Sequence, residues 1–100
     1  MSRSSLVDYT LLSPNNSGKR THKIDRITPH CFVGQVTAER GAREFASTSK
    51  KASCQYVIAK DGRVALVCDE DNRSWCTSSN SNDQRAITIE CASDAGSPYT

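Results

Sequence analysis

Two short runs of the sequence end in side chains that can do chemistry. Residues 27–31 carry His30 and residues 86–90 carry Glu90, and both runs have the composition of a strand end. Because successive side chains of a strand point to opposite faces, His30 and Glu90 each lie on the face opposite the isoleucines of their run. Neutral imidazole is the commonest zinc ligand in proteins, and a nearby carboxylate can manage the protons of a zinc-bound water. We therefore expect the two strand ends to converge on one cleft.

Each of these residues also has a simpler interpretation. One imidazole makes no metal site, so His30 alone would be a hydrogen-bonded residue at a strand end, and Glu90 a solvated carboxylate. The other histidine, His22, lies in a polar, basic stretch and is interpreted as solvated. The acidic run 69–71 lacks the spacing and the downstream glutamate of a calcium-binding loop, which indicates a solvated turn.

Size and charge limit the classes of function. The chain has 100 residues, 36% of them apolar, and a net charge of +2, so we expect one small domain with a modest core. This charge does not favour nucleic acid or an anionic membrane surface as a partner. No apolar run is long enough to cross a bilayer or to serve as a signal peptide. We therefore expect synthesis without a signal peptide.

The cysteines point to a reducing compartment. There are five of them, an odd number, with neither a CxxC pair nor a regular spacing. This pattern predicts neither a disulfide framework nor a four-cysteine zinc site. We expect Cys31, Cys68 and Cys91 to behave as small buried hydrophobic residues at strand ends.

The first half of the chain reads as an arm, a strand and a helix. Residues 1–23 are rich in polar side chains and turn formers, which predicts an N-terminal arm rather than a core element. A strand is predicted over 24–31, where Pro29 removes a ladder donor and favours an edge or a strand terminus. Thr37 can cap a helix that we expect to end near Ser47.

The second half reads as a hairpin, a polar loop and a strand. Asp61-Gly62 between two β-branched runs predicts a hairpin, because both residues tolerate positive φ. Residues 69–83 read as a polar loop that contains an isolated tryptophan, Trp75, and a last strand is predicted over 85–91. A few strands and one helix can cover only one face of a sheet. We expect the other face to expose Ile and Val, and the chain to be marginally stable or to self-associate.

Four segments resemble a known family in their order and spacing. They resemble the type-2 N-acetylmuramoyl-L-alanine amidases, a family of phage and prophage lysins that is related to the peptidoglycan-recognition proteins. The matching segments are residues 22–31, 56–64, 72–76 and 82–90.

The resemblance implies a fold and a zinc site. The implied fold is α/β (α+β), a mixed central sheet flanked by helices, with residues 24–100 forming the N-terminal part of the catalytic domain. His30 matches the first zinc ligand, and Glu90 matches a glutamate that acts as acid and base in a subset of members. Tyr56 matches a tyrosine that contacts the zinc-bound water or the tetrahedral intermediate, and Trp75 falls where the family lines its substrate groove.

The chemistry implied is zinc-dependent hydrolysis of the amide between N-acetylmuramic acid and L-alanine in peptidoglycan. By resemblance, a second histidine and a cysteine or aspartate ligand lie beyond Thr100, so the domain is expected to be incomplete at its C-terminus. Pro29 and Cys76 differ from many members. The alternative is a non-catalytic peptidoglycan-binding module or an inactive remnant, and a site completed by another copy of the chain remains open. The resemblance implies synthesis in the bacterial cytoplasm and action on the cell wall after release from the cell, with no nucleic-acid partner and no membrane insertion.

Overall fold

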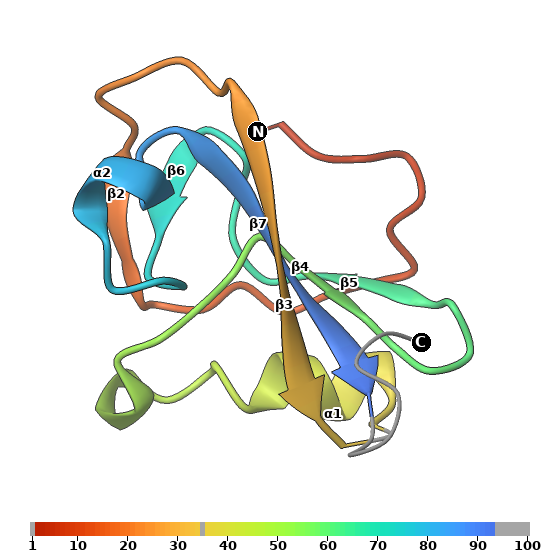
Figure 1. Ribbon diagram of the computed structural model, residues 1–100. Coiled ribbons are helices and arrows are strands. Elements are labelled where there is room, and N and C mark those ends of the chain that lie inside the picture. The colour runs from red at the N-terminus through yellow and green to blue at the C-terminus, as the bar shows by residue number, and fades with distance from the viewer. Residues whose placement is uncertain (1, 35, 94–100) are drawn as a thin grey trace.

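The computed structural model describes residues 2–34 and 36–93, and a mixed sheet is the main element of this part of the chain (Figure 1). Its strands lie in the order β1 (Tyr9–Thr10), β5 (Val64–Leu66), β4 (Tyr56–Ile58), β7 (Ala86–Ser93) and β3 (Arg26–Val33). β4 and β5 are antiparallel, and the other neighbouring strands are parallel. A smaller sheet pairs β2 (Asn16–Lys19) with β6 (Asn72–Ser74). This mixed α+β sheet architecture was expected from the resemblance and is confirmed.

Short helices complete the described structure. They are α1 (Ala38–Arg43), the 3₁₀ turn η1 (Thr48–Lys50) and α2 (Asn80–Asp83). α1 packs on one face of the main sheet, against β1, β4 and β5, and α2 lies beside the small sheet (Figure 1). None of the helices in the described residues has the length and apolar character needed to cross a membrane.

Strands β3 and β7 lie side by side along their whole length, which is the feature that positions the site. The predicted strand over 24–31 is confirmed, with its bounds moved to Arg26–Val33. β3 lies at the edge of the sheet, where the missing N–H of Pro29 costs least, as predicted. Thr28 pairs with Thr88, and His30 pairs with Glu90.

Helix α1 begins where the sequence predicts and ends earlier. The hydroxyl of Thr37 accepts a hydrogen bond from the N–H of Arg40 at 3.1 Å, so the predicted cap is confirmed. The helix ends at Arg43 rather than near Ser47. The buried amide of Asn15 donates to the carbonyl of Ser47 at 2.9 Å, so the chain after α1 bonds to the N-terminal segment instead of continuing the helix.

The hairpin is confirmed, but its turn differs from the prediction. The N–H of Ala59 bonds to the carbonyl of Arg63 at 2.9 Å, which leaves a three-residue loop over 60–62. Gly62 has a φ of 87°, whereas Asp61 does not adopt positive φ. A type I turn followed by a left-handed glycine joins strands with the correct twist, so one glycine is sufficient.

The segment before Ile24 contributes more than the sequence predicts. β1 adds an edge to the main sheet and β2 pairs with β6, while the side chains of Ser13 and Asn15 are buried. Main-chain hydrogen bonds need no apolar side chains, so the polar composition hid this pairing. The division of the chain into an arm and a domain at Ile24 stays a prediction.

The polar stretch over 69–83 is also more ordered than a loop, because it contains β6 and α2. Its structure rests on buried polar contacts rather than on an apolar pattern. All five cysteines are free thiols. Cys54 and Cys68 are buried and Cys91 is half-buried, but Cys31 is exposed on the edge strand, so the expectation that it is buried is wrong.

The face of the sheet away from α1 is apolar and open, as predicted. An open groove of about 200 Å³ runs along it. It is lined by Ser4, Leu6, Tyr56, Ile58, Val64, Ile87 and Ile89. The side chain of Leu6 is 73% exposed, and Ile27 on β3 is 67% exposed.

Candidate active site

His30 and Glu90 meet at the centre of the candidate site. They occupy paired positions on the adjacent parallel strands β3 and β7, and Nδ1 of His30 lies 3.2 Å from Oε1 of Glu90. The imidazole is 40% exposed, whereas the carboxylate is 13% exposed. The predicted convergence of His30 and Glu90 is therefore confirmed, but neither residue ends its strand, because β3 continues to Val33 and β7 to Ser93.

A third side chain, Cys76, completes the cluster. Its Sγ donates to Oε1 of Glu90 at 3.6 Å and lies 3.8 Å from Nδ1 of His30. Cys76 comes from the loop between β6 and α2, far in sequence from either strand. In the sequence, Cys76 stands out only as a departure from many family members. Its position beside His30 is not predictable, because no spacing in the chain relates the two residues.

Asp83 holds the loop that carries Cys76. This fully buried carboxylate accepts hydrogen bonds at 3.1 Å from the N–H groups of Cys76 and Thr77, and at 2.7 Å from the Thr77 hydroxyl. Arg73 lies 3.5 Å from the same carboxylate. On the other side, Ser53 accepts from the N–H of Trp75 at 3.1 Å. Hydrogen bonds to the residues before and after Cys76 therefore hold the backbone that carries the thiol.

A buried polar network holds β7 next to Glu90. Thr88 shares the face of Glu90 and is fully buried. The side-chain oxygen of Gln55 accepts from the N–H of Thr88 at 2.9 Å and from its hydroxyl at 2.7 Å. The hydroxyl of Ser74 lies 2.7 Å from that of Thr88. These contacts connect the residue just before β4 with β6 and β7 beneath the site, and satisfied networks of this kind favour a single arrangement.

Burial raises the pKa of two side chains in the cluster, the Glu90 carboxyl and the Cys76 thiol. Burial raises the pKa of the Glu90 carboxyl, and the adjacent His30 partly offsets this effect. Burial also raises the pKa of the Cys76 thiol to about 12, helped by the negative charge of Glu90. In the metal-free protein the thiol is therefore protonated and donates to the carboxylate.

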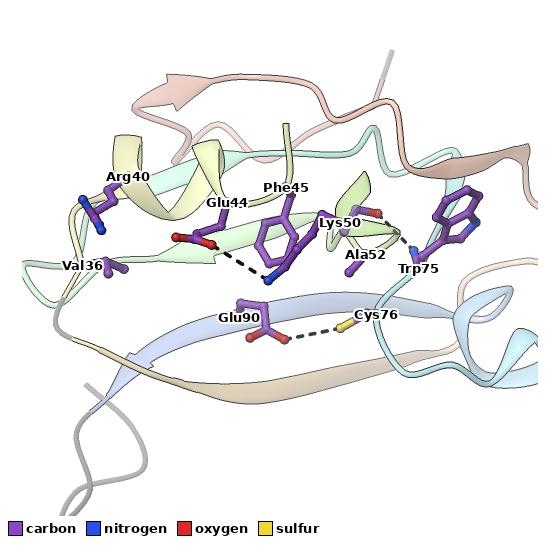
Figure 2. Close-up of a pocket in the computed structure, with 10 residues that line it drawn as sticks. Val36, Arg40, Glu44, Phe45, Lys50, Ala52, Trp75, Cys76 and Glu90 are labelled. Carbon is purple, nitrogen blue, oxygen red and sulfur yellow. Dashed lines mark hydrogen bonds and ion pairs between the residues drawn. The ribbon is translucent and has the colours of Figure 1, made fainter. Parts of the chain in front are cut away.

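The cluster borders an open pocket of about 450 Å³ (Figure 2). Glu90 and Cys76 form one side, and Arg40, Glu44 and Lys50 face them from α1 and η1. Lys50 lies 3.9 Å from Glu44.

Trp75 lies at the end of the pocket (Figure 2). Its indole N–H donates to the hydroxyl of Ser17 at 2.8 Å, so β2 holds the ring. The structure thus places Trp75 beside the pocket, and its role in substrate binding stays a prediction.

Tyr56 is not brought to this site. It pairs with Ile89, on the face of the sheet opposite Glu90, and lines the apolar groove. Its hydroxyl donates to Glu70 and accepts from the N–H of Ser4 at 2.8 Å. The structure therefore differs from the prediction that Tyr56 acts at the zinc-bound water, because the strand alternation that unites His30 and Glu90 directs Tyr56 away from them.

The donor set of the cluster suits zinc. His30, Cys76 and Glu90 each offer one ligand atom, and these atoms all lie within 4.8 Å of one another. Imidazole nitrogen, thiolate and carboxylate oxygen are the groups that bind Zn²⁺ in proteins. The pocket beside them leaves room for a further ligand, as catalytic zinc sites require.

Comparisons with known proteins place the chain in a family. The profile of the N-acetylmuramoyl-L-alanine amidase family matches residues 20–100. The chain therefore belongs to the N-acetylmuramoyl-L-alanine amidase family, as the sequence resemblance implies. Curated protein sequences include no significant match.

Several solved structures share the fold, among them PlyL, a mutant endolysin and the PlyG catalytic domain. PlyL is similar with a TM-score of 0.69 and 14% identity over 88% of this chain and 58% of PlyL. A mutant endolysin from Bacillus subtilis is similar with a TM-score of 0.71 and 17% identity, over 93% of this chain and 66% of the endolysin. The PlyG catalytic domain is similar with a TM-score of 0.64 and 16% identity, over 84% of this chain and 54% of that domain. The chain thus spans between about half and two thirds of the length of these structures.

Proposed function

We propose that the protein hydrolyses the amide between N-acetylmuramic acid and L-alanine in bacterial peptidoglycan. The observation that carries this proposal is the contact of His30 with Glu90 at 3.2 Å, beside an open pocket. Membership of the amidase family supports the choice of bond. By this proposal the protein acts on the cell wall after synthesis in the bacterial cytoplasm.

The residues of the pocket have separate roles. His30 and its neighbours in the cluster would hold Zn²⁺, which when bound supplies Lewis-acid polarisation of the scissile carbonyl and a nucleophile at neutral pH. Glu90 lies where its carboxylate can take a proton from water and return it to the leaving amine. Trp75 offers an aromatic wall for the glycan or the stem peptide, and Arg40 and Lys50 add positive charge for carboxylates of the peptide.

The experiment incubates the chain and zinc with purified peptidoglycan and measures two products. Amide hydrolysis creates new N-terminal L-alanine, whereas glycosidase activity creates new reducing sugar ends. We expect N-terminal L-alanine without new reducing ends, and no product with His30→Ala. Release of reducing ends, or the absence of N-terminal L-alanine with the folded wild-type chain, would contradict the proposal.

A non-catalytic peptidoglycan-binding module is the second candidate. The observation in its favour is that the chain spans only 58% of PlyL and 54% of the PlyG catalytic domain. This function predicts co-sedimentation with insoluble peptidoglycan, abolished by Trp75→Ala, with no new N-terminal L-alanine. The two products of the same incubation therefore separate the candidates.

A further inference from the structure

We propose that Cys76 is a metal ligand, so that His30, Cys76 and Glu90 form a site for a thiophilic divalent cation. This inference deepens the proposed function, because it names a donor that the family resemblance does not supply. It rests on three distances, on the way in which each donor is held, and on the open side of the cluster.

The three donor atoms have the spacing of one face of a zinc tetrahedron. With ordinary zinc–ligand bond lengths and tetrahedral angles, N and O ligands lie about 3.3 Å apart, N and S about 3.6 Å, and O and S about 3.5 Å. The corresponding distances here are 3.2 Å, 3.8 Å and 3.6 Å. A cation can therefore contact all three atoms with shifts of a few tenths of an ångström.

Each donor is held in place without the cation. His30 and Glu90 are fixed by the paired register of β3 and β7. Cys76 is fixed by the bonds of the buried Asp83 carboxylate to its own N–H and to that of Thr77, at 3.1 Å each. A site built on such supported elements loses little entropy when it binds.

Binding of the cation releases one proton to solvent. Before binding, the Cys76 thiol donates its hydrogen to Glu90. On binding, this hydrogen leaves to solvent as a proton, and the resulting thiolate contacts the cation. Oε1 of Glu90 becomes a ligand and Oε2 stays free to handle the proton of the proposed reaction. The pocket beside the cluster supplies the open position.

The test uses Cd²⁺, whose thiolate complexes absorb in the ultraviolet. We expect the wild-type chain, titrated without substrate or thiol reductants, to show a charge-transfer band that saturates at one ion per chain. Zn²⁺ should displace the band and Mg²⁺ should not, because thiolates prefer soft cations. Cys76→Ser should abolish the band. His30→Ala should weaken Cd²⁺ binding by more than roughly 10-fold, because the loss of an outer-shell partner already costs that much.

Cys31→Ser is the matched control. It removes an exposed thiol next to His30 in sequence, on the opposite face of β3, and should keep the full band. A second measurement needs no variant: Zn²⁺ should protect Cys76, but not Cys31, from alkylation by iodoacetamide, read by peptide mass. No band in the wild type, a band kept in Cys76→Ser, or alkylation of Cys76 that Zn²⁺ leaves unchanged would overturn the inference. A normal band without release of L-alanine would overturn only the proposed function.

Discussion

The candidate site depends on one register between two parallel strands. Because β3 and β7 pair residue for residue, His30 lies opposite Glu90, and a slip of one residue would send one of them to the other face. Strand alternation alone predicts which face each side chain takes. It does not predict Cys76, which a loop brings to the cluster, and it explains why Tyr56 faces away.

At the residue scale, Glu90→Gln tests proton transfer. The amide keeps the size of the carboxylate but cannot take a proton, so the rate of L-alanine release should fall by roughly 100-fold or more. Far-UV circular dichroism of the variant should match that of the wild type. An unchanged rate in the folded variant would remove Glu90 from the reaction.

A titration of Tyr56 tests the contacts on the opposite face of the sheet. Burial and the hydrogen bond to Glu70 raise its pKa from 10.0 to about 12. Because the folded state favours the neutral phenol, the stabilisation is complete below pH 10.0 and is lost as the pH rises through about 12. Titration of tyrosinate absorbance should show a component near 12 that is missing in Tyr56→Phe. A variant curve identical to the wild-type curve would show that Tyr56 is not held in this way.

At the element scale, the polar segments were harder to predict than the apolar ones. The hairpin is visible in the sequence because Asp61-Gly62 separates two β-branched runs, although the structure uses a three-residue loop. Residues 69–83 read as a loop because the order of β6 and α2 rests on buried side chains such as Asp83 and Gln55. Such polar contacts follow neither the helical nor the strand period, so they leave no periodic signal in the sequence.

Asp83→Ala tests this buried support. The substitution removes the carboxylate that pairs with Arg73 and frees the N–H groups of Cys76 and Thr77, so we expect a loss of about 3 kcal/mol in the free energy of unfolding. Asp71→Ala removes an exposed carboxylate from the same segment and should cost less than about 0.5 kcal/mol. Urea denaturation measures both values. Equal midpoints for the two variants would show that Asp83 does not hold the loop.

At the scale of the whole molecule, α1 covers one side of the sheet, and the described residues leave an open apolar groove on the other. The sequence predicts this imbalance, because one helix can cover only one face. It does not predict that β1 extends this sheet or that β2 pairs with β6 in a second sheet, since both pairings use main-chain groups. The apolar groove and the exposed Ile27 form an apolar surface whose exposure to water is unfavourable.

Self-association should therefore depend on this open face. We expect the wild-type chain to sediment as more than a monomer at high concentration, and Ile27→Lys to shift it towards the monomer with little change in stability. Ile27 suits this test because its side chain is 67% exposed on the edge strand. A wild-type chain that stays strictly monomeric would contradict the expectation.

The proposed reaction is hydrolysis of the amide between N-acetylmuramic acid and L-alanine in peptidoglycan. The most direct measurement is the appearance of N-terminal L-alanine when the wild-type chain and zinc are incubated with purified peptidoglycan. We expect these termini to accumulate with time, without new reducing ends, and His30→Ala to produce none. Peptidoglycan that binds the folded chain but gains no N-terminal L-alanine would contradict the proposal.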